Sequence, residues 1–336
     1  MGLSAGLTTQ DPAVRRVSAV LRVAFAACLA VVFVGAAVAA SPTQLGFTVF
    51  ARTSLPLGDV VWTGEQFVYV AERTGELDAS GPDGKHVTKL AKLPAEFEEV
   101  RCAISPGAHG WPAHELFCHG PHGEIWQIGA DGSVLRFATL PATGLQDGAL
   151  AFDEGGSFGY ALLASSGGSA EQGGTVYAVG PNGGISTVGV YPHPGGTDNI
   201  ALAPARFGSA SGDLLLAIDA RSKGGRLLAM APDGSVRLLA RFAHGLNPIV
   251  VLAAGDTPQG AAQPGFYVSD TVTKNVYLLS AAQITQYAGD VLVGGEKGLA
   301  RFWVVRPVAR GFTATRIHTS LESRSNWNFE GAAYVP

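Results

Sequence analysis

A repeat of about fifty residues constrains the fold of this chain more than any other sequence feature. Copies begin at Gly75, Gly123, Gly174 and Gly225, and a weaker copy begins near Asn275 in the 336-residue sequence. Each clear copy holds a short apolar strand, an Asp-Gly or Asn-Gly pair and a second strand. These pairs favour the positive φ angles of tight turns, so every copy predicts a β-hairpin.

Two further strands are expected before each hairpin, the first of them short and very apolar. In the fifth copy these strands are predicted at residues 249–252 and 265–269, ahead of a third strand near Asn275. Four antiparallel strands that recur at this spacing are typical of a propeller blade. Residues 41–336 accommodate six such units, so we predict an all-β, six-bladed β-propeller with four antiparallel strands per blade.

The last blade is expected to be shared between the two ends of the chain. Residues 289–296 resemble a second strand, residues 301–305 a third strand and residues 329–335 an innermost strand. Residues 47–52 resemble an outermost strand. Pairing of the N- and C-terminal strands would close the ring and remove an open sheet edge.

The first 40 residues have the pattern of a signal peptide. Three arginines precede an uncharged apolar run over residues 23–39, which ends in small residues. An uncleaved anchor is the alternative, because a run of this length can just span a bilayer. The propeller at residues 41–336 is therefore expected outside the cytoplasm, either secreted or periplasmic, and at a membrane only if the segment stays uncleaved.

Two cysteines, Cys102 and Cys118, remain after the predicted signal peptide. Two cysteines in an exported chain indicate one disulfide. The repeat places them on adjacent antiparallel strands, whose facing positions have the Cα separation that a disulfide needs. We therefore predict a Cys102–Cys118 bond.

The charge of the chain limits its partners. The formal net charge is −4 and no basic run follows residue 40. Nucleic acid is therefore not expected as a partner, since phosphate binding needs a Lys/Arg footprint. A monomer is expected, with a small molecule or a protein as the partner at the polar face described next.

Polar side chains stand at the start of every innermost strand, where all carry an amide or carboxylate oxygen. They are Asp59, Glu99, Asp147, Asn199, Asn247 and Glu330. Innermost strands line the central channel, so these groups should converge at its mouth. Such groups also cap turns at strand starts, which is the structural alternative. Because Ca²⁺ prefers these oxygens, we predict a divalent cation, held by Asp59, Asp147, Asn199, Asn247 and Glu330.

A second polar ring is predicted on the same face, at the ends of the second strands. Its members are Glu72, His119, Ser165, Asp219, Asp270 and Glu296, with Arg73 and Asp198 beside them. Glu72, Arg73, His119, Asp219, Asp270 and Glu296 are candidate ligand-binding residues. Glu99, His119 and Asp198 are candidate catalytic groups, since a histidine or carboxylate can act as a general base.

The architecture resembles the six-bladed propellers of the gluconolactonase, strictosidine-synthase-like and NHL-repeat group. The likeness is carried by residues 57–62 and 67–70, which are similar to the first strands of the lactonases. The resemblance implies a divalent metal, with Asp59 where that family has Glu, and with Asp147, Asn199 and Asn247 matching its other ligands. It also implies metal-dependent hydrolysis of a lactone or ester.

Residues 69–77, with Glu72 followed by Arg73, also resemble the first blade of quinoprotein sugar dehydrogenases. That resemblance implies a quinone cofactor, PQQ, surrounded by several basic groups and a histidine. This chain offers only Arg73, His119 and Arg221, so PQQ is not expected. The sequence favours a ligand-binding or interaction module with a bound cation, and the metal-dependent hydrolase is the alternative.

Overall fold

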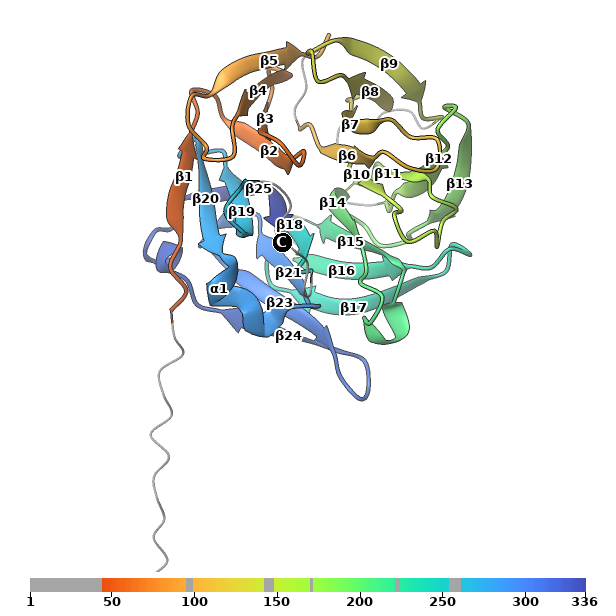
Figure 1. The fold of residues 1–336 in the computed structure, drawn as a ribbon. Helices are drawn as coiled ribbons and strands as arrows, with labels where there is room; N and C mark the ends of the chain where they lie inside the picture. Colours follow the sequence, from red (N-terminus) through yellow and green to blue (C-terminus); the bar gives the residue numbers. More distant parts are fainter. Residues whose placement is uncertain (1–43, 95–98, 142–147, 170–171, 221–223, 254–260) are drawn as a thin grey trace, which may run out of the picture. The chain divides into compact units, whose positions relative to one another are not determined.

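The computed structural model describes residues 44–94, 99–141, 148–169, 172–220, 224–253 and 261–336. The predicted signal peptide and Asp147 lie outside these ranges. Within them the strands form six antiparallel sheets, arranged as blades around a channel (Figure 1). The predicted all-β, six-bladed propeller is therefore confirmed.

The first four blades follow the predicted strand order from the axis outward. The first blade consists of β2 (Leu57–Trp62), β3 (Phe67–Ala71), β4 (Glu76–Ser80) and β5 (Thr88–Lys92). The second blade consists of β6 (Cys102–Pro106), β7 (Ala113–His119), β8 (Glu124–Ile128) and β9 (Val134–Thr139). The third consists of β10 (Leu150–Phe152), β11 (Leu162–Ser166), β12 (Thr175–Val179) and β13 (Ile185–Val190). The fourth consists of β14 (Gly196–Leu202), β15 (Leu214–Asp219), β16 (Gly225–Met230) and β17 (Val236–Phe242).

The fifth and closing blades exchange strands along the chain. The fifth blade consists of β18 (Leu246–Val251), β21 (Val291–Gly295), β23 (Phe302–Pro307) and β24 (Phe312–Ile317). The closing blade has β25 (Trp327–Val335) near the axis, followed outward by β19 (Gly265–Asp270), β20 (Asn275–Ser280) and β1 (Thr48–Arg52). A short strand, β22 (Lys297–Gly298), pairs with the other edge of β25.

The expected composition of the fifth blade is wrong in its second and third strands. β19 and β20, predicted to follow β18 in the same sheet, instead pair with β25 and β1. In the fifth blade, β21 pairs with β18 as the second strand, and β23 pairs with β21 as the third strand. The two sets of strands have the same apolar pattern, so periodicity alone does not distinguish them. The predicted roles of residues 47–52 as an outermost strand and 329–335 as an innermost strand are confirmed.

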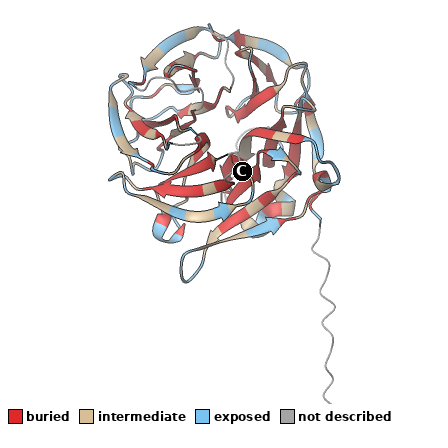
Figure 2. Cartoon of the chain, turned by 180° about the vertical axis from the view of Figure 1, so that it is seen from behind, coloured by how far each residue is buried: buried red, intermediate tan, exposed pale blue. Residues whose placement is uncertain are grey.

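Burial follows the distance of a strand from the axis. β2 and β3 are buried along their whole length, whereas the outer β9 and β13 alternate between exposed and half-buried positions (Figure 2). Aromatic rings fill the junction between the closing and first blades, where the Phe67 and Tyr267 ring centroids lie 4.6 Å apart. Removal of this apolar surface from water is the main force that holds neighbouring blades together.

The helical segments that the structure describes are short. They are α1 (Ala281–Ile284) and the 3₁₀ turns η1 (Gly208–Ala210), η3 (Thr285–Tyr287) and η4 (Ser320–Ser323). None of these described helices has the length and apolar character that crossing a membrane requires.

The predicted disulfide is present in the second blade. Cys102 on β6 and Cys118 on β7 are directly paired in the strand register, with their Cα atoms 4.1 Å apart. The bond therefore joins the innermost strand of this blade to its neighbour, next to the channel wall.

Candidate functional site

The start of each innermost strand lies at one mouth of the central channel. Asp59 lies on β2, Asn199 on β14, Asn247 on β18 and Glu330 on β25, while Glu99 precedes β6. β25 packs between β2 and β18, so its Glu330 stands between the first and fifth blades. The structure therefore brings most of the predicted inner ring together, and Asp147 lies outside the described residues.

A buried arginine that the sequence analysis did not single out occupies the centre of this ring. The Arg101 side chain is only 3% exposed, and its Nη2 lies 3.2 Å from Glu99 Oε2 and 2.8 Å from Glu330 Oε2. Its Nε donates to the Asp198 carbonyl at 2.8 Å and its Nη1 to the Gly58 carbonyl at 2.6 Å. Burial lowers its pKa, but the neighbouring carboxylates raise it further, so the guanidinium stays charged. The chain thus supplies its own cation to the inner ring.

Glu330 accepts hydrogen bonds from three side chains at once. Besides Arg101, Asn247 Nδ2 donates to its Oε2 at 2.5 Å, and Asn328 Nδ2 donates to its Oε1 at 2.6 Å. Burial, together with the carboxylates of Glu99, Glu296 and Glu72, raises the pKa of Glu330 to about 8 despite Arg101. The site therefore holds more negative charge than one guanidinium balances, and Glu330 binds a proton near neutral pH.

The carboxylate of Asp59 is bonded to the backbone. Its Oδ1 accepts from Val60 N at 2.8 Å and its Oδ2 from Cys102 N at 2.9 Å, which links the first blade to the second. An added Cβ on Gly331 would lie 2.0 Å from Oδ1, so the group rests directly on the closing blade. Burial raises its pKa to about 6. The bond to Val60 is a local backbone contact of the kind that the structural alternative expects, whereas the bond to Cys102 connects two blades.

Two groups of three carboxylates remain close enough to share an ion. Oxygen atoms of Glu72, Glu99 and Glu330 lie within 4.8 Å of one another. The same holds for Asp198, Asp219 and Glu296, which we call the outer acidic cluster.

The outer acidic cluster draws on two blades. Asp198 and Asp219 belong to β14 and β15 of the fourth blade, and Glu296 follows β21 of the fifth. Burial and the neighbouring Asp219 raise the pKa of Glu296 to about 7. Lys297 Nζ forms an ion pair with Glu296 Oε1 from an exposed position. Carboxylates gathered this closely favour a bound proton or a bound cation.

His119 lies at the end of β7 but is buried in a tight space. An added Cβ on Gly148 would lie 2.4 Å from its ring, so the imidazole occupies the space that a side chain at position 148 would need. Burial lowers its pKa to about 4, so the ring is neutral. Neither ring nitrogen has a hydrogen-bond partner among the described residues.

The remaining members of the second ring have different surroundings. Asp270 Oδ2 accepts from Thr273 N at 2.8 Å and its Oδ1 accepts from Asn328 N at 2.8 Å, so this carboxylate orders its own turn. Ser165 Oγ accepts from Ala149 N at 3.0 Å. Arg73 is exposed and has a positive φ of 69°. The predicted second ring is therefore not one uniform surface. Asp219 and Glu296 belong to the outer acidic cluster and Glu72 to the inner acidic group. Asp270 and Ser165 are bonded to the backbone.

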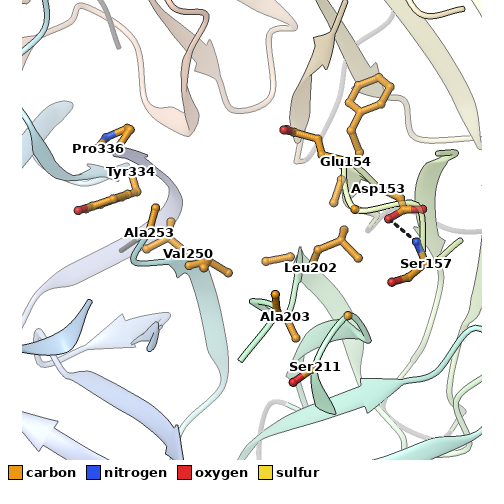
Figure 3. A pocket seen from close by; sticks show the side chains of 17 residues that line it. Asp153, Glu154, Ser157, Leu202, Ala203, Ser211, Val250, Ala253, Tyr334 and Pro336 are labelled. Carbon is orange, nitrogen blue, oxygen red and sulfur yellow. Dashed lines mark hydrogen bonds between the residues drawn. The ribbon is translucent and has the colours of Figure 1, made fainter. Parts of the chain in front are cut away.

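Two adjoining cavities follow the channel away from these acids. The first has a volume of about 330 Å³, and Asp59, Arg101 and Asn199 are among its lining residues. The second, of about 740 Å³, opens at the opposite end of the channel (Figure 3). Leu202 and Val250 form part of its apolar wall. Phe152, Glu154 and Tyr334 line both cavities.

Sequence reasoning missed Arg101 and Asn328, which both donate hydrogen bonds to Glu330. A signal for Arg101 was present. It is a lone arginine at the start of a predicted channel-lining strand, two residues after Glu99, where its charge needs acidic neighbours. Asn328 gave no comparable signal, because its role depends on the turn that brings it beside Asp270.

Comparisons with known proteins support no family assignment. No family model matches the chain, and no curated protein matches it. Among solved structures, hydrazine synthase from Kuenenia stuttgartiensis is 10% identical with a TM-score of 0.45, over 79% of this chain and 67% of that chain. A protein from Lactobacillus plantarum is 13% identical with a TM-score of 0.47, over 82% of this chain and 73% of that one. The PQQ-bound aldose sugar dehydrogenase from Streptomyces coelicolor is 14% identical with a TM-score of 0.48, over 83% and 90%. Similarity at this level carries no argument about activity.

Proposed function

We propose that the protein is an exported ligand-binding propeller that holds a divalent cation, Ca²⁺, at the outer acidic cluster. The observation that supports this proposal is the convergence of Asp198, Asp219 and Glu296, whose oxygen atoms lie within 4.8 Å of one another. Hard cations of this kind bind carboxylate oxygens and complete their coordination with water or with ligand oxygens. The bound ion would then present open positions to an oxygen-rich small molecule or to a protein at the channel mouth.

The inner group of Glu72, Glu99 and Glu330 is the less favourable place for the ion. Arg101 already faces Glu99 and Glu330, and Glu330 accepts hydrogen bonds from Asn247 and Asn328 as well. A cation there would have to compete with a buried guanidinium. In the outer acidic cluster, Glu296 is paired with Lys297, whose side chain is exposed and can move aside more easily than the buried Arg101.

The export of the protein is part of the proposal. The Cys102–Cys118 bond supports it, since disulfides persist in oxidising compartments. Extracellular and periplasmic sites also meet Ca²⁺ at concentrations that weak carboxylate sites can use.

Calorimetric titration of chelator-treated protein tests the cation. We expect heat on addition of Ca²⁺, compared in parallel with Mg²⁺, Mn²⁺ and Zn²⁺. Glu296→Gln removes one ligand charge and should weaken Ca²⁺ binding by at least about tenfold. Glu154→Gln, at the opposite end of the channel, is the matched control and should bind as the unaltered protein does. The absence of heat with all four ions would rule out the proposed centre.

The same preparations distinguish binding from turnover. A bound ion can polarise a carbonyl, which is the chemistry of the metal-dependent lactone or ester hydrolase that the resemblance implies. Ca²⁺-dependent hydrolysis of a gluconolactone that disappears in Glu296→Gln would make the protein an enzyme of that class. Cation binding without hydrolysis supports the binding module.

A further inference from the structure

A cationic group lies on the channel-mouth face of the fourth blade, outside the acidic site. Arg226 is the second residue of β16 and Arg241 lies near the end of β17, and the two are direct partners in the strand register. Arg226 Nη1 donates to the Pro194 carbonyl at 3.2 Å, which brings it to the connection between β13 and β14. His193 precedes Pro194 in that connection.

Among the described residues, the charges of this group are not neutralised by a carboxylate. Within the ranges described, no carboxylate forms a salt bridge with Arg226 or Arg241, and Arg226 Nε is buried without a hydrogen-bond partner. Like charges directly opposite each other on adjacent strands destabilise a sheet. Partial burial and the charges of both arginines lower the pKa of His193, which directly precedes the residue whose carbonyl accepts from Arg226.

We propose that Arg226, Arg241 and His193 bind an oxyanion, namely the phosphate, sulfate or carboxylate group of a small molecule. A guanidinium offers planar paired donors that match such groups, and an anion would relieve the repulsion between the two arginines. The register places this oxyanion site beside the outer acidic cluster, because Asp219 pairs with Gly225, the residue before Arg226. The proposal goes beyond the cation and does not depend on it.

The fifth blade contains a partial copy of the same arrangement. His244 lies in the loop after β17 and Arg301 immediately precedes β23, the third strand of that blade. Burial and Arg301 lower the pKa of His244, as burial and two arginines do for His193. Among the described residues, no second arginine lowers the pKa of His244. Substitution of Arg301 therefore serves as a control within the same protein, because it removes an arginine beside a histidine where the facing arginine pair is absent.

Titration calorimetry with inorganic phosphate, sulfate and citrate tests the oxyanion site. A chelator is present and chloride keeps the ionic strength constant, so that cation binding does not contribute. Loss of one charge-assisted hydrogen bond weakens binding by about tenfold or more. We expect this loss in Arg226→Gln and in Arg241→Gln. Arg301→Gln and Arg136→Gln, an exposed position on β9, should bind as the unaltered protein does.

The three anions identify the group that is recognised. Stronger binding of phosphate and sulfate than of citrate assigns the site to tetrahedral oxyanions, and the reverse order assigns it to carboxylates. Arg241 is exposed, so its variant should fold normally, and circular dichroism verifies this for both variants. Absence of heat with every anion overturns the proposal. Equal losses in Arg301→Gln and Arg241→Gln also overturn it, because they would reflect general surface charge.

Discussion

Arg101 Nη2 and Glu330 Oε2 lie 2.8 Å apart at the channel mouth, although 229 residues separate them in the sequence. Both side chains are buried, at 3% and 1% exposure. Arg101 belongs to the second blade and Glu330 to the closing blade, with the first blade between them. Their contact therefore joins the closing blade, which holds both terminal strands, to the second blade.

Removal of this guanidinium should strongly destabilise the propeller. In Arg101→Met, Glu99 loses its counter-charge and the buried Glu330 loses its charged hydrogen-bond donor, and loss of one partner of a buried pair costs about 3–5 kcal/mol. Urea unfolding measures the loss. The double variant Arg101→Met/Glu330→Met should recover much of it, because an apolar pair then replaces the buried polar one and the acid left without Arg101 is the partly exposed Glu99. Arg136→Gln is the surface control, and a comparable loss there would contradict the assignment to the buried pair.

The stability should fall as the pH rises from 6.5 to 8. The pKa of Glu296 is raised to about 7 and that of Glu330 from 4.5 to about 8, so the folded protein binds these protons more tightly than the unfolded chain does. This stabilisation is fully present below the pKa that each group has in the unfolded chain. It is lost as the pH rises through the higher pKa of the folded protein, by at most about 1.4 kcal/mol per pH unit for each proton.

The free energy of unfolding, measured with urea across this range, checks this dependence. His119, with its pKa lowered from 6.5 to about 4, is neutral in the folded protein but still partly protonated in the unfolded chain at pH 6.5, so it adds an opposing slope that fades toward pH 8. Glu330→Gln keeps a neutral group at the site, so its profile should be flatter. A stability that rises between pH 6.5 and 8 would show that the carboxyls are ionised in the folded protein.

The disulfide should contribute to stability through the unfolded chain. The bond joins positions 16 residues apart, and closure of a loop of this size stabilises a protein by about 3 kcal/mol. Cys102→Ala/Cys118→Ala should lose stability of that order in urea unfolding. A reductant should destabilise the unaltered protein and leave the double variant unchanged. Two free thiols in the unfolded, unreduced protein would contradict the bond.

A single methyl group at Gly331 should disturb the channel mouth. An added Cβ there would lie 2.0 Å from Asp59 Oδ1 and 2.4 Å from the Asp59 Cα atom, so Gly331→Ala forces β25 away from β2. Overpacking of this kind costs about 1–3 kcal/mol. Gly155→Ala, whose Cβ would have its nearest neighbour at 3.9 Å, is the control. Thermal unfolding compares the two, and equal melting temperatures would argue against the close approach.

Local sequence features were enough to predict most of the blades and the polar residues at their strand starts. Asp-Gly and Asn-Gly turns mark the hairpins, and the length of the repeat indicates blades. The polar residues at strand starts were also found, because a side chain such as Asp59 bonds to the backbone of the strand it begins. These features depend on residues close together in the chain, which is why a single sequence shows them.

The rest depends on contacts between distant segments. β19 and β21 are both short and apolar, and an acidic residue stands at the end of β19 and directly after β21, so their sequences fit either sheet. The pairings of β19 with β25 and of β20 with β1 distinguish them. Arg101 was missed for a similar reason. Its acidic partner Glu330 lies near the other end of the sequence, and a search for metal-ligand patterns excludes cationic side chains.

The strand exchange has a consequence for the order in which the chain can fold during synthesis. β18 emerges early, but its neighbour β21 follows only after β19 and β20 have been made. The inner edge of β19 can pair only after β25, the last strand of the chain, has been synthesised. β20 can already pair with β1 before that. Four blades can thus form one after another, whereas the last two are completed together. A chain that stops before β25 leaves a gap at the axis and leaves Arg101 without Glu330.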